Sequence, residues 1–228
     1  MTLGIIGAMS VETDALKSLV KDAVRETVGG VEFVSGRIGS TRVVVAQCGI
    51  GKVFAGICTQ TMILRFGVDR IINTGVAGTL SPELGLLDIA LSTAMVQHDM
   101  DTSPLGDPVG MISGINIVEI PASKTLCDEI EAAAERLGKH VVRGVIASGD
   151  QFIAKREKKE WIRDTFSAVA CEMEGAAIAQ VSYANGVDFA VIRSISDNAD
   201  DTAGTLEYPE LCRRAAEQSQ KLILELLR

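Results

Sequence analysis

The sequence predicts an α/β fold in which one central mixed β-sheet is flanked by helices. Short runs of apolar, mostly β-branched residues alternate with longer segments of helical spacing, which is typical of a sheet covered by helices. Strand-like runs also follow one another without an intervening helix at residues 31–47, so the sheet is expected to be mixed. With 228 residues and no repeat, low-complexity tract or linker, residues 1–228 are expected to form a single domain.

The expected elements are read from periodicity and turn residues. The strands are Leu3–Gly7, Val31–Gly36, Arg42–Gln47, Arg70–Thr74, Asp88–Val96, Val141–Ser148, Ala168–Cys171 and Asp188–Ser196. The helices are Val11–Val20, Val53–Phe66, Ser123–Leu137, Lys155–Thr165, Gly175–Ala184 and Glu207–Leu227. The connection from Gln97 to Gly114 is longer than a usual loop and rich in Asp, Gly and Pro, as functional lids and interface segments are.

Composition and charge narrow the class of protein. The chain has no uncharged apolar stretch of about 18 residues and no signal-peptide pattern, so neither a membrane span nor secretion is expected. Five scattered cysteines without CxxC spacing indicate reduced thiols and a cytoplasmic location. A net charge of −8 without a basic stripe argues against a nucleic-acid partner and suits a small neutral or cationic ligand.

Ligands of open α/β sheets bind beyond the carboxyl ends of the strands, where helices begin. Glu12 lies in the first turn of the helix after the first strand, a position that would also suit simple compensation of the helix dipole. The segment QCGIGKV at residues 47–53 lacks the spacing and the Ser or Thr of a phosphate loop, which excludes a nucleoside triphosphate site. Gly75 and Gly78 bracket a predicted turn after an apolar strand, where the backbone can reverse or approach a ligand.

Later junctions carry an aromatic ring and several carboxylates. Phe152 and Ile153 follow a strand, where they either hold a flat base or pack as core. Glu172 and Glu174 lie where an apolar strand turns into a helix, and such a carboxylate accepts two hydrogen bonds, as a vicinal diol such as ribose requires. Strand alternation places Arg193 and Asp197 on one face, as a buried ion pair or as part of a site.

These segments also carry a family resemblance. Seven motifs in order, GIIGAM with Glu12, CGIGKV, INTGVAG, HDMD, SGDQFI, CEMEGAAIA and RSISDNAD, extend from the first strand to about Asp200. Together they resemble the bacterial 5'-methylthioadenosine/S-adenosylhomocysteine nucleosidases, within the nucleoside phosphorylase/hydrolase superfamily. The resemblance implies a nucleoside phosphorylase-like fold and hydrolysis of the N-ribosidic bond of 5'-methylthioadenosine and S-adenosylhomocysteine, with 5'-deoxyadenosine as a further candidate substrate.

The resemblance assigns catalytic roles to two acids that lie far apart in the sequence, Glu12 and Asp197. Cleaving the bond between C1' and N9 passes through an oxocarbenium-like ribosyl cation. By similarity, Asp197 donates a proton to adenine N7 and Glu12 activates the attacking water. Because Arg193 beside Asp197 would lower the pKa of that acid, we expect Arg193 to pair with Glu12 instead and to help fix the water.

The remaining implied site residues bind the substrate. By similarity, Glu174 grips the ribose hydroxyls beside Met173, Phe152 stacks on adenine, and the backbones of Ile153 and Gly78 approach the substrate.

Two further residues are expected near the 5' end of the substrate, and two positions bear on how far this sequence follows the family pattern. Met9 and Ile50 are expected to form the pocket for the 5'-thio group. Val76 stands where family members often carry serine, so a hydroxyl is missing there. Tyr208 is the candidate for the aromatic residue that covers the substrate in the family, and it would serve equally as a surface residue at a helix start.

Partners follow from the resemblance and alternatives remain. A homodimer is implied, with the 97–114 connection capping the neighbouring site. No cofactor or metal is expected, because the two histidines, His98 and His140, lack ligand spacing. One alternative is a purine nucleoside phosphorylase, which would need converging arginines around phosphate, whereas Glu12 would repel an anion. A second is a non-catalytic adenosine-binding domain, which would not need both Glu12 and Asp197. A dinucleotide-binding oxidoreductase is disfavoured because the sequence lacks the glycine motif of such a site.

Overall fold

The computed structural model, which describes residues 1–199 and 208–228, is built on one mixed sheet. Parallel pairs such as β1 with β4 lie beside antiparallel pairs such as β3 with β4, which confirms the predicted fold class. In hydrogen-bonding order the strands are β10 (Asp188–Asp197), β6 (Ile89–Gln97), β8 (Val141–Ser148), β9 (Ala168–Glu172), β5 (Arg70–Thr79), β1 (Thr2–Gly7), β4 (Thr41–Gln47), β3 (Val31–Ile38) and β2 (Lys21–Val28), with β7 (Ile120–Pro121) paired to β6.

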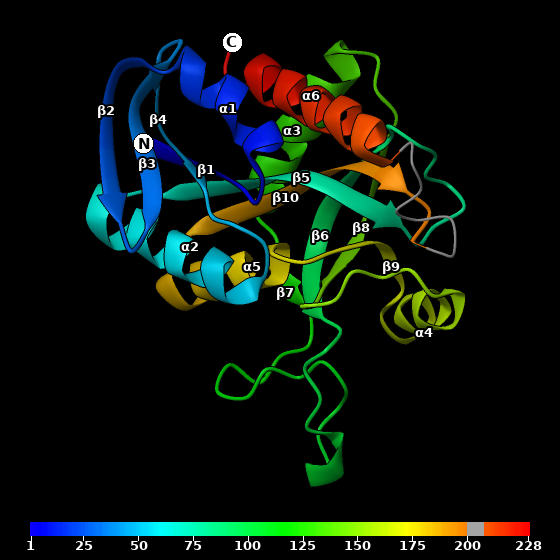
Figure 1. Cartoon of the computed structure of the whole chain (residues 1–228). Coiled ribbons are helices and arrows are strands. Elements are labelled where there is room, and N and C mark those ends of the chain that lie inside the picture. The colour runs from blue at the N-terminus through cyan, green and yellow to red at the C-terminus, as the bar shows by residue number, and fades with distance from the viewer. Residues whose placement is uncertain (200–207) are drawn as a thin grey trace.

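Part of this sheet closes on itself. Strand β10 pairs with β5 as well as with β6, so β5, β10, β6, β8 and β9 form a ring of paired strands. Strands β1, β4, β3 and β2 extend the sheet outward from β5 (Figure 1). The ring brings strand ends from distant parts of the sequence to one place.

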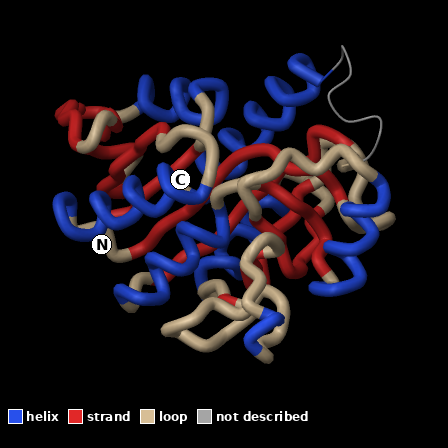
Figure 2. Tube along the Cα trace, turned by 60° about the horizontal axis from the view of Figure 1, so that its bottom comes forward, coloured by secondary structure: helices blue, strands red, loops and turns tan. Residues whose placement is uncertain are grey.

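Helices cover both faces of the sheet (Figures 1 and 2). On one side lie α1 (Ser10–Leu19), α3 (Lys124–Arg136) and α6 (Tyr208–Leu226); on the other lie α2 (Lys52–Phe66) and α5 (Gly175–Asn185), while α4 (Arg156–Phe166) packs against β8 and β9. Strand β1 serves both cores: Leu3 and Ile5 pack with α1, α3 and α6, and Ile6 packs with α2 and α5, as strand alternation requires. None of the helices in the described residues has the length and apolar composition needed to cross a membrane.

The predicted strands and helices are confirmed within a few residues at their ends, except that residue 207, the expected start of the last helix, lies outside the described residues. Strand β2 was not predicted because its sequence, KDAVRETV, is polar and largely exposed, as suits the edge of a sheet. The predicted turn at Gly75 and Gly78 is wrong, since β5 continues to Thr79. Both glycines lie within the strand, where other side chains approach the backbone closely.

The long connection after β6 projects away from the body of the molecule (Figure 1). It contains a short 3₁₀ helix, η1 (Ser103–Leu105), and an isolated bridge between Ile112 and Ile117. Leu105 at its outer part is 84% exposed. An exposed apolar side chain on a projecting loop is compatible with the predicted interface role, which stays a prediction.

Two leucines of α1 differ in burial, so their replacement should change the free energy of unfolding by different amounts. Leu16 is fully buried among β1, α3 and α6, whereas Leu19 on the same helix is 46% exposed. We expect Leu16→Ala to lower the free energy of unfolding by about 2–5 kcal/mol through lost contacts and a cavity. Leu19→Ala, the control, should change it by no more than about 0.5 kcal/mol. Urea unfolding followed by circular dichroism measures both, and equal effects would contradict the described packing.

Candidate active site

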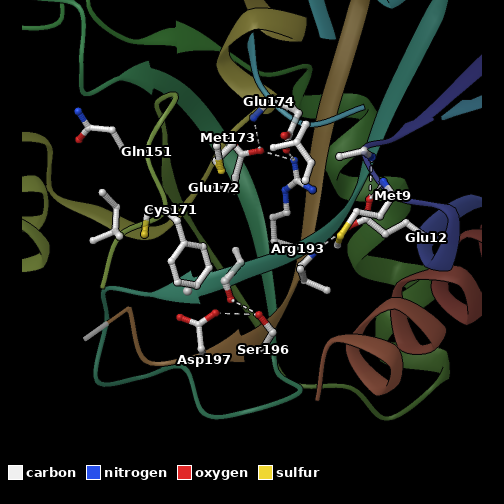
Figure 3. Close-up of a pocket in the computed structure, with 17 residues that line it drawn as sticks. Met9, Glu12, Gln151, Cys171, Glu172, Met173, Glu174, Arg193, Ser196 and Asp197 are labelled. Carbon is white, nitrogen blue, oxygen red and sulfur yellow. Dashed lines mark hydrogen bonds and ion pairs between the residues drawn. The ribbon is translucent and has the colours of Figure 1, made fainter. Parts of the chain in front are cut away.

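A cavity lies where the carboxyl ends of β1, β5, β8, β9 and β10 meet (Figure 3). It brings together all but one of the predicted catalytic and substrate-binding residues: Met9, Glu12, Ile50, Gly78, Phe152, Ile153, Met173, Glu174, Arg193 and Asp197. The exception is Tyr208, at the start of α6, whose side chain lies outside the described part of the chain. Other lining residues include Val76, Gln151, Cys171, Glu172 and Ser196.

Glu12 is held in the cavity by backbone donors from two elements. Its Oε2 atom accepts hydrogen bonds from the amides of Ala8 at 2.7 Å and Met9 at 2.9 Å, and its Oε1 atom accepts from the Val76 amide at 3.2 Å. The side chain is almost fully buried, and burial raises the pKa of Glu12 although Arg193 and the three amides oppose the rise. The carboxylate lines the cavity, and its hydrogen bonds reach β5 as well as the turn before α1, so its contacts extend beyond the end of its own helix.

Arg193 is buried at the centre of the site, and its predicted ion pair with Glu12 is wrong. The Nη2 atom contacts the Glu172 carboxylate and the Asn73 side chain, and lies 3.7 Å from Glu174 Oε2. Glu172 is the closer partner because β9 ends beside β5, opposite the β10 strand that carries Arg193. Burial disfavours the guanidinium charge, yet Glu172, Glu174 and Glu12 together raise the pKa of Arg193.

Glu172 is a further functional candidate, which the family resemblance does not include among the implied site residues. Besides Arg193, its carboxylate accepts hydrogen bonds from the Ser148 hydroxyl and from the amides of Glu174 at 2.9 Å and Gly175 at 2.8 Å. These amides belong to the first turn of α5, where a negative charge is favoured. In the sequence, the feature that indicates Glu172 is the presence of two carboxylates in CEMEGA, of which Glu172 is the first and ends the strand.

Glu174 turns its carboxylate toward the start of α2. Its Oε1 atom accepts a hydrogen bond of 2.8 Å from the Gly51 amide. Burial and the neighbouring Glu172 raise the pKa of Glu174 to about 7, although Arg193 and the Gly51 amide act in the opposite direction. This carboxylate can therefore change its charge close to neutral pH.

Asp197 ends β10 and lies on the opposite side of the cavity from Glu12 and Glu174 (Figure 3). Its Oδ2 atom accepts a hydrogen bond of 2.9 Å from the Ser196 hydroxyl, and its Oδ1 atom accepts one of 2.8 Å from the Ala199 amide. The register between β10 and β5 shifts at this point, opposite Gly78. A Cβ atom at Gly78 would lie 2.8 Å from Asp197 Oδ1, so the absence of a side chain there leaves room for the acid.

Apolar side chains line the mouth of the cavity. Phe152 is 51% exposed and Ile50 is 57% exposed, whereas Ile153 is buried. Both exposed residues line the cavity although solvent reaches them. Such half-exposed apolar walls suit a flat base or an alkyl group that covers them on binding. No group of His, Cys, Asp and Glu suited to hold a metal ion occurs among the described residues.

Close packing at Gly75 gives the site a testable requirement. A Cβ atom at Gly75 would lie 2.0 Å from Arg193 Nη1 and 2.5 Å from Glu12 Oε1, whereas one at Gly56 in α2 would make an ordinary contact of 3.8 Å with Val181. We expect Gly75→Ala to destabilise the protein by about 1–3 kcal/mol through overpacking. Gly56→Ala should not destabilise it. Thermal unfolding compares the two, and equal melting temperatures would contradict the described packing.

Comparisons with known proteins place the chain in a family. The model of the phosphorylase superfamily matches residues 2–228. A 5'-methylthioadenosine/S-adenosylhomocysteine nucleosidase of Shewanella halifaxensis is 37% identical over 229 residues, which cover 100% of this chain and 99% of the relative. The corresponding nucleosidase of Neisseria meningitidis, solved with methylthio-immucillin-A, has a TM-score of 0.95 at 33% identity and covers 99% of this chain and 97% of its own.

A second kind of relative has the same fold. The futalosine hydrolase of Helicobacter pylori strain 26695 has a TM-score of 0.94 at 36% identity, with coverage of 99% of this chain and 97% of its own. The full-length match and the curated relatives together show that the chain belongs to the 5'-methylthioadenosine/S-adenosylhomocysteine nucleosidase family, within the phosphorylase superfamily.

Proposed function

We propose that this protein hydrolyses the N-ribosidic bond of 5'-methylthioadenosine and S-adenosylhomocysteine and releases adenine. The observation that carries the proposal is the placement of two acids, Glu12 and Asp197, in one cavity together with Glu174. The relatives named for this activity support the substrate class. The proposed products are adenine and the 5'-thio-substituted ribose.

Departure of adenine requires a proton donor, because the leaving base would otherwise carry a negative charge. Asp197 is proposed to give its proton to N7, and the bond between C1' and N9 then breaks with its electron pair going to the base. The Ser196 hydroxyl and the Ala199 amide fix the carboxyl group. General acid assistance of this kind contributes about 10²- to 10⁴-fold to a rate.

Water is proposed to attack the ribosyl cation from the side of Glu12. The carboxylate takes one proton from water as the oxygen bonds to C1', so that charges balance when Asp197 has lost its own proton. Burial raises the pKa of Glu12 despite Arg193 and three amide donors, which makes it a stronger base than an exposed glutamate. Val76 contributes its backbone amide to this carboxylate rather than a side-chain hydroxyl.

Ribose is proposed to bind at Glu174 and the purine near Phe152. A carboxylate with two oxygens accepts both hydroxyls of a vicinal diol, with Met173 beside the sugar. Phe152 is proposed to stack on adenine while the backbones of Ile153 and Gly78 approach the substrate. The half-exposed Phe152 ring would lose its contact with solvent in this arrangement.

The 5' substituent is proposed to lie against Met9 and Ile50. Both residues line the cavity, and Ile50 is more than half exposed, which leaves space for substituents of different size. We include 5'-deoxyadenosine among the proposed substrates on this ground. Tyr208 is proposed as the residue that covers the substrate.

The role of Arg193 changes with its observed partners. Since it contacts Glu172 rather than Glu12, we propose that it supports the site through its charge, which opposes the rise in the pKa of Glu12 and of Glu174 that burial causes. It then does not position the water directly.

The main alternative is phosphorolysis, because the superfamily is named for phosphorylases. Phosphate would meet four carboxylates among the residues lining the cavity, Glu12, Glu172, Glu174 and Asp197. The guanidinium that lines the cavity, that of Arg193, already contacts Glu172. This charge distribution disfavours an anion as nucleophile. A non-catalytic adenosine-binding domain would not need both Glu12 and Asp197 in its cavity.

Assembly and location are further parts of the proposal. We propose a cytoplasmic homodimer that serves methionine salvage, in which the 97–114 connection caps the neighbouring site. Exposed apolar side chains at and before the start of α2, Ile50, Val53, Phe54 and Ile57, support an interface beside the cavity. The exposed Leu105 on the projecting connection supports a contact of that connection with a second copy.

Replacement of either Asp197 or Glu12 should reduce catalysis while the protein still folds. In phosphate-free buffer we expect Asp197→Asn and Glu12→Gln each to slow adenine release from 5'-methylthioadenosine by about 100-fold or more. The control Asp188→Asn, at the exposed start of the same strand, should retain full activity. Adenine is measured by chromatography. Unchanged rates in both acid variants would overturn the proposed roles.

Ribose binding by Glu174 predicts a pH dependence of KM. Its pKa is raised to about 7 by burial and Glu172, and the charged form is the better acceptor for hydroxyls. KM should therefore be lowest above pH 7 and should rise as the pH falls through that value. In Glu174→Gln, KM should be high and should no longer vary across this range. A pH-dependent KM that persists in Glu174→Gln would assign the effect to another group.

A further inference from the structure

Three segments that meet beside the cavity are joined by a ring of hydrogen bonds. The Lys52 ammonium donates to Asp99 Oδ1 at 2.6 Å, the Asp150 amide donates to Asp99 Oδ2 at 2.9 Å, and the Lys52 amide donates to Asp150 Oδ1 at 2.8 Å. Lys52 is the first residue of α2, and Asp99 and Asp150 each lie two residues after the end of a strand, β6 and β8 respectively. We call them the Lys52–Asp99–Asp150 ring; none of them lines the cavity.

The ring adjoins two parts of the proposed binding site. Gly51, directly before Lys52, donates its amide hydrogen to Glu174. Gln151, Phe152 and Ile153, directly after Asp150, line the cavity. The ring therefore joins the segment that carries the donor to Glu174 with the segment proposed to hold adenine.

The position of Gly51 depends on this packing. Its φ angle is 101°, which favours glycine, and a Cβ atom there would lie 3.0 Å from Asp150 Oδ1. Asp150 thus packs against Gly51 and accepts the neighbouring amide of Lys52. A shift of Asp150 would release the constraint on the peptide that faces Glu174.

The partners of Asp99 suit a permanent ion pair. Its side chain and that of Lys52 are 17% and 18% exposed. Burial opposes the Asp99 charge, but the Lys52 and Asp150 donors lower the pKa of Asp99 below its ordinary value. The adjacent His98 is buried against Gly149, and burial lowers its pKa, so at neutral pH it does not compete with Lys52 as a cation.

We propose that Lys52, Asp99 and Asp150 are positioning residues that hold the Gly51 amide against Glu174 and thereby keep this carboxylate ready to accept the ribose hydroxyls. The inference rests on the proposed ribose-binding role of Glu174. It gives the HDMD and SGDQFI motifs, which supply Asp99 and Asp150, a task that does not require contact with substrate.

The groups that face Glu174 define what the ring adds. Glu172 from β9 and Glu12 from α1 disfavour its charge, Arg193 from β10 favours it, and the buried Cys48 thiol after β4 lies close enough to be affected by it. The Gly51 amide from α2 is the hydrogen-bond donor to its Oε1 atom. Loosening this amide removes a stabilising contact of the charged form and raises the pKa of Glu174.

The test measures Glu174 in the protein without substrate. Its carboxyl carbon is followed by ¹³C NMR during a pH titration and assigned by its loss in Glu174→Gln. We expect Asp99→Asn and Lys52→Met each to raise the pKa of Glu174 by about half a unit to one unit. The double variant should shift it no further, because both changes open one ring. Lys52→Arg, which keeps the charge, should restore most of the wild-type value.

Glu129→Gln is the matched control. It removes an ion pair of 2.7 Å between Arg70 and Glu129 at the start of β5, at the opposite end of that strand from the cavity, and should leave Glu174 unchanged. If the pKa of Glu174 in both ring variants equals that in the wild type, the proposal is overturned. If Asp99→Asn does not fold, Lys52→Met decides alone, since it alters a partly exposed side chain.

Kinetics separate this inference from the proposed function. With 5'-methylthioadenosine at pH 7, the ring variants should raise KM more than they lower kcat. A wild-type protein that releases no adenine would overturn the proposed function, while the titration would still decide whether the ring acts on Glu174. Active enzyme with unshifted Glu174 and unchanged KM in the ring variants would overturn the ring alone.

Discussion

The buried contact between Arg193 and Glu172 is the interaction on which the site depends. Four carboxylates line the described cavity, and placing them together out of water is costly unless opposite charge or hydrogen bonds offset their repulsion. Glu172 pairs with Nη2 of the guanidinium and is itself held by the start of α5. Because Arg193 is thereby fixed at the centre, Glu12 and Glu174 experience its charge without being neutralised by direct hydrogen bonds to it.

This division of roles explains why similar carboxylates can do different work. Glu12 is held by backbone amides and Glu174 by a single one, and both stay available to a ligand on their remaining sides. Asp197 is separated from this group, at the far side of the cavity beside Gly78 (Figure 3). The acid proposed as proton donor and the carboxylate proposed as proton acceptor therefore line one cavity, as hydrolysis of a glycosidic bond requires.

Much of this arrangement could be predicted from the sequence, because β-branched runs and helix-start signals identify where strands end. The candidates at those ends do converge, apart from Tyr208, which the described residues do not test. The partner of Arg193 could not be predicted, since strand spacing does not show that β9 ends opposite β10. The glycines Gly75 and Gly78 suggested a turn because local propensity cannot reveal side chains from distant parts of the sequence that need their space. The polar edge strand β2 lacked the apolar alternation that identifies a strand.

The most direct test of the hydrolytic account follows the oxygen that reaches C1'. The protein is incubated with 5'-methylthioadenosine in ¹⁸O-labelled water, with and without phosphate, and the sugar product is examined by mass spectrometry. Attack by a water activated at Glu12 predicts one ¹⁸O atom in free methylthioribose under both conditions. Formation of a sugar phosphate that requires added phosphate would contradict the account and would identify phosphorolysis instead.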